Sequence, residues 1–200
     1  DTTLSFTSVP TDALWTYTAK VGYSDVYTLV GAAYSGTYKD ISAEGLSPTG
    51  VAFSYDGTKM YIVDNANDTV YQYTLATAWN VNTATYASLS KSVTAQEDTP
   101  QDLSFSLDGT KMYIVGWTND TVYQYTLGTA WNVSTATYAS LSKSVTAQET
   151  YPNGLTFSSD GTKMYIVGQT NDTVYQYTLG TAWDVSTATY ASLSKSIVAE

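Results

Sequence analysis

Short apolar runs separated by Asp-Gly and Asn-Asp turns recur along the chain. In the last copy the runs cover residues 154–158, 163–167, 173–179 and 192–198. Runs of this length bounded by turn residues predict β-strands, and Asp-Gly between two runs predicts a hairpin because glycine tolerates a positive φ. Each copy is therefore predicted to form four antiparallel strands.

The second and fourth runs of a copy differ in their hydrophobic pattern. Residues 164–167 (Met-Tyr-Ile-Val) are consecutive apolar positions, so both faces of this strand are predicted to be buried between sheets. Leu193 and Ile197 instead lie among serines, which is typical of a partly solvated outer strand. Four antiparallel strands with a two-sided apolar inner part and a wetter edge are typical of a β-propeller blade.

The copies follow one another at an interval of 52 residues: Asp56-Gly57 recurs at Asp108 and Asp160. Residues 103–148 and 155–200 differ at seven of 46 positions, and the first 50 residues align with the others only weakly. We expect one repeat domain over residues 1–200, with units 1–50 (degenerate), 51–102, 103–154 and 155–200. The predicted fold is all-β, of β-propeller type, with four blades of four antiparallel strands. These blades either close into a ring or form an open, assembling array.

Two motifs of the repeat resemble a known family. Leu-x-Phe-Ser-x-Asp-Gly-Thr-Lys-Met-Tyr-Ile-Val, followed by Asn-Asp-Thr-Val-Tyr-Gln-Tyr, is similar to the blade repeats of the NHL and YVTN-like β-propellers. The segment Thr-Ala-Trp-Asp-Val-Ser-Thr-Ala-Thr-Tyr is similar to repeats of secreted bacterial and phage structural proteins. The resemblance covers residues 51–200 and implies the fold rather than one function. It also implies that the fourth-to-first (D–A) and second-to-third (B–C) strand connections share one face, usually the ligand face.

Composition narrows the classes of partner and chemistry. Eight lysines and no arginine stand against 18 acidic residues, giving a net charge of −10, which argues against nucleic acid. We expect no membrane insertion, because no apolar run is long enough to span a bilayer. The Thr, Ser, Tyr and Asn-rich surface favours an extracellular, cell-surface or virion location. Without His or Cys, the remaining chemistry is a carboxylate pair or an oxygen-ligand Ca²⁺ site.

Residues that differ between the copies mark candidate sites, because the repeated Asp-Gly turns and Trp79, Trp131 and Trp183 are explained by turn formation and packing. The variable positions lie in the D–A and B–C connections. Trp117 and Tyr151, with Gln101 and Asn153, are predicted to form a ligand platform for a sugar ring or a protein. Drift at exposed loop tips is the competing explanation.

Three acidic residues, Asp64, Asp98 and Asp102, occupy the matching connections one unit earlier. They could bind a cation such as Ca²⁺ or act as an acidic pair, and a solvated acidic rim is the competing explanation. We expect no other metal or cofactor.

These observations favour a non-catalytic extracellular or virion-surface module rather than an enzyme. Such a module could be a self-assembling filament or sheath subunit or an adhesin-like binder. Its expected partners are further copies of itself, other surface proteins or a glycan. The alternative is a carboxylate-dependent glycan hydrolase.

Overall fold

The computed structural model describes residues 35–45 and 47–197. The chain divides into two compact units, residues 1–37 and 38–200, and the following concerns the second. Most of the predicted degenerate first blade, residues 1–50, lies outside the described residues. The predicted single domain over residues 1–200 stays a prediction.

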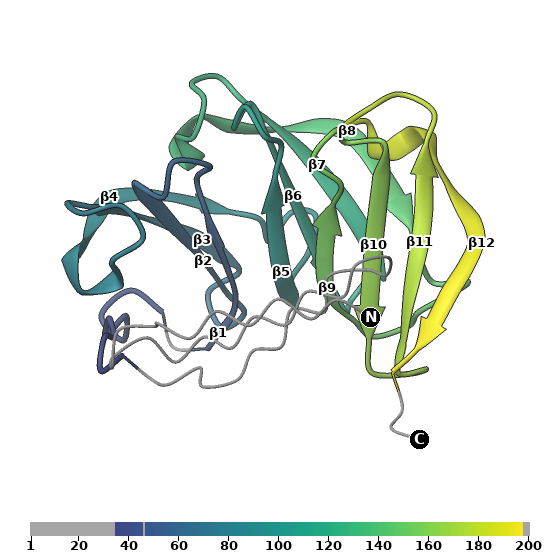
Figure 1. Ribbon diagram of the computed structural model, residues 1–200, viewed down its shortest axis with the longest axis horizontal. Coiled ribbons are helices and arrows are strands. Elements are labelled where there is room, and N and C mark those ends of the chain that lie inside the picture. Colours follow the sequence, from purple (N-terminus) through teal and green to yellow (C-terminus); the bar gives the residue numbers. More distant parts are fainter. Residues whose placement is uncertain (1–34, 46, 198–200) are drawn as a thin grey trace, which may run out of the picture. The chain divides into compact units, whose positions relative to one another are not determined.

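The described residues form twelve strands in three four-stranded antiparallel sheets, each ordered as its strands follow in the chain (Figure 1). The first sheet contains β1 (Pro48–Phe53), β2 (Lys59–Asp64), β3 (Thr69–Leu75) and β4 (Ala84–Ser92). The second contains β5 (Pro100–Phe105), β6 (Lys111–Gly116), β7 (Thr121–Leu127) and β8 (Ala136–Ser144). The third contains β9 (Pro152–Phe157), β10 (Lys163–Gly168), β11 (Thr173–Leu179) and β12 (Ala188–Ser196). This confirms the all-β, propeller-type fold, with one four-stranded blade per complete repeat.

The last strand of each repeat begins earlier than the sequence pattern predicted. Strand β12 starts at Ala188, whereas the prediction placed it at residues 192–198. A short 3₁₀ helix, Val185–Thr187, ends the preceding connection, and the Asp184 side chain caps it by accepting a hydrogen bond from the Ser186 amide. The connection is therefore shorter than predicted, because the cap gives the Ser186 amide a hydrogen-bond acceptor within the connection itself. Equivalent helices lie at Val81–Thr83 and Val133–Thr135.

The Asp-Gly turns are structural, as predicted. In the second repeat Asp108 Oδ1 accepts hydrogen bonds from the hydroxyls of Ser106 (2.6 Å) and Thr110 (2.8 Å) and from the Thr110 amide (3.0 Å). These bonds, the Ser106 hydroxyl first, lower the pKa of Asp108 to about 2. Gly109 has φ 69°, and a Cβ there would lie 2.2 Å from the Trp131 ring. The tryptophan therefore packs directly on the turn glycine.

Successive sheets pack face to face through apolar side chains. The inner first strands adjoin one another, β1 against β5 and β5 against β9. One core lies between the first and second sheets and includes Tyr61, Val63 and Met112, and another lies between the second and third and includes Tyr113, Val115 and Met164. The two-sided apolar pattern of the second strand thus serves packing between sheets, as predicted.

No described helix is long and apolar enough to cross a membrane.

Candidate functional site

The inner strands β1, β5 and β9 carry one ionisable side chain, Asp102. Their sequences are PTGVAF, PQDLSF and PNGLTF, so the position of Asp102 is glycine in the other two repeats. A Cβ added at Gly50 would lie 2.7 Å from Asp102 Oδ1, and one at Gly154 would lie 2.7 Å from Val167. The neighbouring glycine on β1 therefore leaves the room that the Asp102 side chain occupies.

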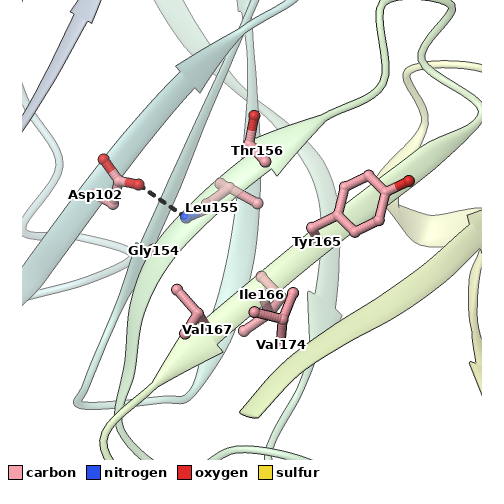
Figure 2. Close-up of a pocket in the computed structure, with 8 residues that line it drawn as sticks. All are labelled: Asp102, Gly154, Leu155, Thr156, Tyr165, Ile166, Val167 and Val174. Carbon is pink, nitrogen blue, oxygen red and sulfur yellow. Dashed lines mark hydrogen bonds between the residues drawn. The ribbon is translucent and has the colours of Figure 1, made fainter. Parts of the chain in front are cut away.

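Asp102 joins two inner strands through its carboxylate. Oδ1 accepts a hydrogen bond from the Leu103 amide (2.8 Å), and Oδ2 accepts one from the Leu155 amide of β9 (2.8 Å), drawn in Figure 2. Burial raises the pKa of Asp102 to about 6, even though both amide hydrogen bonds act to lower it. Asp102 is therefore mostly ionised near neutral pH yet able to take up a proton.

An apolar pocket of about 340 Å³ adjoins this carboxylate. Figure 2 shows Asp102 at one side, the backbone of Gly154 and Leu155 beside it, and Tyr165 at the opposite side. The other lining residues are Thr156, Ile166, Val167 and Val174. Every lining side chain except Asp102 is uncharged, so the pocket combines one carboxylate with a poorly solvated wall.

Three of the four predicted ligand residues lie together. The Trp117 and Tyr151 rings pack edge to face with centroids 5.8 Å apart, and Trp117 Nε1 donates a hydrogen bond to Asn153 Oδ1 (2.7 Å). Tyr151 is half exposed, at 52%. Gln101 is buried instead, and its amide donates to the Thr99 carbonyl (3.1 Å). Whether this platform binds a ligand stays a prediction.

The backbone places these residues on one face, as the resemblance implied. The Trp117 amide of a B–C connection donates to the Thr99 carbonyl of a D–A connection (3.2 Å). Gln169 and Tyr151 make the same contact in the next repeat (3.1 Å).

The three predicted acidic residues have separate hydrogen-bonding partners. Asp64 is fully buried and accepts hydrogen bonds from the amides of Ser47 (2.6 Å) and Asn67 (2.9 Å). Asp98 accepts a hydrogen bond from the Thr118 hydroxyl, and Asp102 bonds the two amides described above. Across residues 35–45 and 47–197, no three His, Cys, Asp or Glu side chains are grouped as metal ligands would be. A Ca²⁺ site stays a prediction without such a group to support it.

Sequence reasoning missed two buried carboxylates, Glu97 and Glu149. Glu149 Oε1 accepts hydrogen bonds from the amides of Tyr151 (2.9 Å) and Thr170 (3.0 Å), so it joins the D–A connection to the B–C turn. Burial alone would raise the pKa of Glu149, but these hydrogen bonds hold it below its ordinary value. Oε2 of Glu149 is buried and has no partner among the described residues.

A compensating exchange in the sequence could have revealed this carboxylate. Glu97 and Glu149 each accompany a glycine on the second strand, Gly116 and Gly168 respectively. In the first sheet the acidic residue and the glycine exchange positions: Gly45 lies at the position of the glutamate, and Asp64 lies at the position of the glycine. A Cβ on Gly45 would lie 2.7 Å from Asp64 Oδ2, so the carboxylate occupies the same place but comes from the end of the second strand instead of from the D–A connection.

Three antiparallel blades with adjoining inner strands define a β-propeller protein. The sequence model of one propeller family, described as lactonase, 7-bladed beta-propeller, matches residues 35–194. The chain belongs to this family. No curated protein matches the chain.

Solved structures support the same fold. A protein of Bacteroides fragilis NCTC 9343, provisionally assigned as a 6-phosphogluconolactonase, is 15% identical with a TM-score of 0.54, covering 74% of this chain and 39% of that one. A protein of Lactobacillus plantarum is 18% identical with a TM-score of 0.54, covering 74% and 41%. A Bacteroides uniformis ATCC 8492 protein, with the same provisional assignment as the first, is 14% identical with a TM-score of 0.52, covering 72% and 39%. The chain thus spans about two fifths of the length of these structures.

Family membership corrects the functional prediction. The expected non-catalytic binding or structural module, together with its filament, sheath and adhesin-like roles, is wrong, because the matching family is one of lactonases. The prediction that the chain is not an enzyme falls with it. The lack of His and Cys weighed against catalysis, but the carboxylate chemistry that the sequence left open needs neither. Similarity to propellers in general is confirmed, whereas the family shown is the lactonase family rather than the NHL or YVTN-like one.

Proposed function

We propose that this chain carries the general base of a lactone hydrolase and that Asp102 is that base. The observation that supports it is a single carboxylate, with a pKa raised to about 6, at the wall of an apolar pocket. A base with a pKa near the working pH is both ionised and able to hold a proton, which is the condition for general-base catalysis.

In the proposed reaction Asp102 removes a proton from a water molecule while the oxygen of that water adds to the lactone carbonyl carbon. The resulting tetrahedral intermediate collapses with cleavage of the ring C–O bond. Protonated Asp102 returns the proton to the leaving alkoxide, giving the open hydroxy acid and an unchanged enzyme. The apolar wall strengthens this proton transfer because it keeps bulk water from solvating the carboxylate.

A lactone fits the pocket better than a glycosidic bond. Glycoside hydrolysis uses two carboxyl groups that flank the scissile bond, whereas Asp102 is the only carboxylate among the residues lining this pocket. The predicted carboxylate-dependent hydrolase is therefore retained, with a cyclic ester in place of a glycan.

Charge favours a neutral lactone over a phosphorylated one. Phosphate groups are usually held by Arg or Lys, but the chain has no arginine, carries a net charge of −10, and places no cation in the lining of this pocket. The platform of Trp117, Tyr151 and Asn153, in which Asn153 directly precedes the lining residue Gly154, is suited to stacking on a neutral sugar ring. The extracellular location predicted from composition accords with a freely diffusing neutral substrate.

The test is hydrolysis of glucono-δ-lactone and 6-phosphogluconolactone, followed by pH-stat titration of the acid released. We expect turnover of the neutral lactone with a rate that rises through pH 6. Asp102→Asn, which keeps the size of the side chain, should lower kcat about 10²–10⁴-fold. Asp102→Gly, which copies Gly50 and Gly154, should be equally inactive while the protein stays folded. Asp98→Asn removes a nearby carboxylate of the D–A connection that does not line the pocket, so it is the matched control and should keep the parent rate.

Two outcomes would contradict the proposal: parent-like turnover by Asp102→Asn, or no turnover of either lactone by the parent. Turnover of 6-phosphogluconolactone alone would keep the hydrolase and exclude the neutral substrate class.

A further inference from the structure

The two junctions between described sheets differ at three corresponding positions on the face formed by the D–A and B–C connections. Between the second and third sheets these positions are Trp117, Tyr151 and Asn153, and between the first and second they are Asn65, Thr99 and Gln101. Gln101 is buried and donates to the Thr99 carbonyl, so its amide is used within its own segment. The later junction instead presents two aromatic rings and an amide.

The aromatic pair is not needed to pack one sheet on the next, because the first junction forms with polar residues at these positions. Independent drift at two loop tips does not explain the pair either. Trp117 and Tyr151 come from connections of different repeats, yet their rings pack 5.8 Å apart at an interplanar angle of 80°. Trp117 Nε1 also donates a hydrogen bond to Asn153 Oδ1 (2.7 Å), which fixes the position of the indole.

This hydrogen bond also fixes the orientation of the Asn153 amide. An indole N–H only donates, so the amide oxygen faces Trp117 and the two N–H groups of Nδ2 are left for another acceptor. Nδ2 is accessible to solvent and has no acceptor among residues 35–45 and 47–197. The junction therefore combines an aromatic surface, of which Tyr151 is 52% exposed, with an unused hydrogen-bond donor.

The size of the aromatic surface favours a small ligand. Thr118, Asn119 and Thr150, which adjoin the two aromatic residues in the chain, are polar and exposed. A specific protein partner buries roughly 800 Å² on each side of an interface. Two rings with a polar surround are suited to a single ring-sized ligand instead.

The neighbouring charges favour a neutral ligand with hydroxyl groups. The carboxylates of Asp98 and Glu149 bond the Thr118 hydroxyl and the Tyr151 amide, so the charges beside the rings are negative and disfavour an anionic ligand. An ammonium ligand would be attracted by them, but it has no acceptor for the Asn153 N–H groups.

We propose that Trp117, Tyr151 and Asn153 form a subsite that binds the ring of a neutral pyranose sugar. The C–H face of the sugar stacks on Tyr151, the more exposed of the two rings, and a sugar hydroxyl accepts a hydrogen bond from Asn153 Nδ2. The subsite lies between two sheets that the structure describes, and it does not involve the outer faces of the first and third sheets. Binding there does not depend on lactone hydrolysis by Asp102.

Titration with the methyl glycosides of glucose, galactose and mannose, followed by NMR of the indole N–H signals, tests this subsite. Methyl glycosides are not lactones, so the measurement reports binding alone. We expect the Trp117 signal to shift with at least one of the three, and saturation transfer to be strongest at the C–H protons of one sugar face. The methyl glycoside of glucuronic acid should bind more weakly because of its charge.

The variants copy residues that other repeats carry at the same positions. Trp117→Asn combined with Tyr151→Thr reproduces the first junction, so this double variant should fold and should lower the affinity about tenfold or more. Asn153→Thr copies Thr49 and removes the donor, so it should lower the affinity about 3–10-fold. Tyr151→Thr alone, which changes an exposed side chain, replaces the double variant if circular dichroism shows the latter to be unfolded.

The matched control is Tyr55→Ser, which removes an exposed tyrosine directly before an Asp-Gly turn and copies Ser159. It should bind the glycosides like the parent. A parent that binds none of the three glycosides overturns the proposal, as does parent-like binding by the folded double variant or by Tyr151→Thr. An equal loss of binding in Tyr55→Ser overturns the assignment to this junction, and a glucuronide bound as tightly as the neutral glycosides overturns the ligand class.

Discussion

Asp102 and Asp108 lie six positions apart and have opposite electrostatic environments. At the Asp-Gly turn, hydroxyl and amide donors lower the pKa of Asp108 to about 2, whereas burial on the inner strand raises the pKa of Asp102 to about 6. Asp108 has counterparts with the same hydrogen bonds in Asp56 and Asp160, and Asp102 is replaced by glycine in both other repeats. A carboxylate repeated in every copy supports the fold, and an unrepeated one in a poorly solvated place is the candidate for chemistry.

The buried carboxylates Asp64, Glu97 and Glu149 extend this comparison. Their residue type changes between repeats, and Asp64 lies at the end of β2 whereas Glu97 and Glu149 lie in D–A connections, but each carboxylate accepts amide hydrogen bonds from the same two connections. Position in space, rather than position in sequence, is therefore the property that the repeats share. These groups belong with Asp108 as structural carboxylates.

The largest expected effect comes from removing one of these structural carboxylates. Glu149→Gly leaves the buried amides of Tyr151 and Thr170 without an acceptor and should lower the free energy of unfolding by about 3 kcal/mol. Adding Gly168→Asp copies the arrangement of Gly45 and Asp64 in the first sheet, and it should recover part of the loss if the Tyr151 carbonyl, 2.3 Å from the added Cβ, moves aside. Urea denaturation of the parent, both single variants and the double variant would give a coupling energy of about 1–3 kcal/mol. Independent, additive effects would show that the two arrangements are not equivalent.

The second prediction concerns the sign of the pH dependence. Because the pKa of Asp102 rises from 3.8 to about 6 on folding, the folded state binds more protons between pH 4 and 6, so stability falls as pH rises through this window. Asp102→Asn should remove this decline, because the side chain no longer titrates. For Asp108, whose pKa falls to about 2, stability is instead lost as pH drops from about 4 to 2. Thermal unfolding from pH 2 to 8 would separate the contributions of Asp102 and Asp108. If stability still declines between pH 4 and 6 in Asp102→Asn, another titrating group causes the decline.

The sequence predicted the blades well because each strand is local and is bounded by turn residues. Asp-Gly and the apolar run after it indicated β10 directly, whereas β12 was misplaced because a capped 3₁₀ helix at Val185 ends the connection early. Of the site, divergence between the copies identified Trp117, Tyr151, Asn153 and Asp102. It could not reveal that Asp102 lies apart from Asp64 and Asp98, because the hydrogen bond from Leu155 that fixes it comes from another repeat. The pocket of the proposed site was also missed, since it is formed beside Asp102 by apolar residues that the repeat pattern assigns to packing.

The smallest expected effect compares one tyrosine in two surroundings. Tyr113→Phe removes the hydroxyl that donates to the Trp183 carbonyl and should lower the free energy of unfolding by about 1 kcal/mol, because the buried carbonyl loses its donor. Tyr165→Phe makes the same chemical change at the equivalent position of the third sheet, where the described residues provide no such acceptor. It should therefore change the free energy of unfolding by less than about 0.5 kcal/mol. Chemical denaturation of the parent and of both variants measures the difference. Equal losses for the two variants would mean that Tyr165 already has a covering partner within the chain.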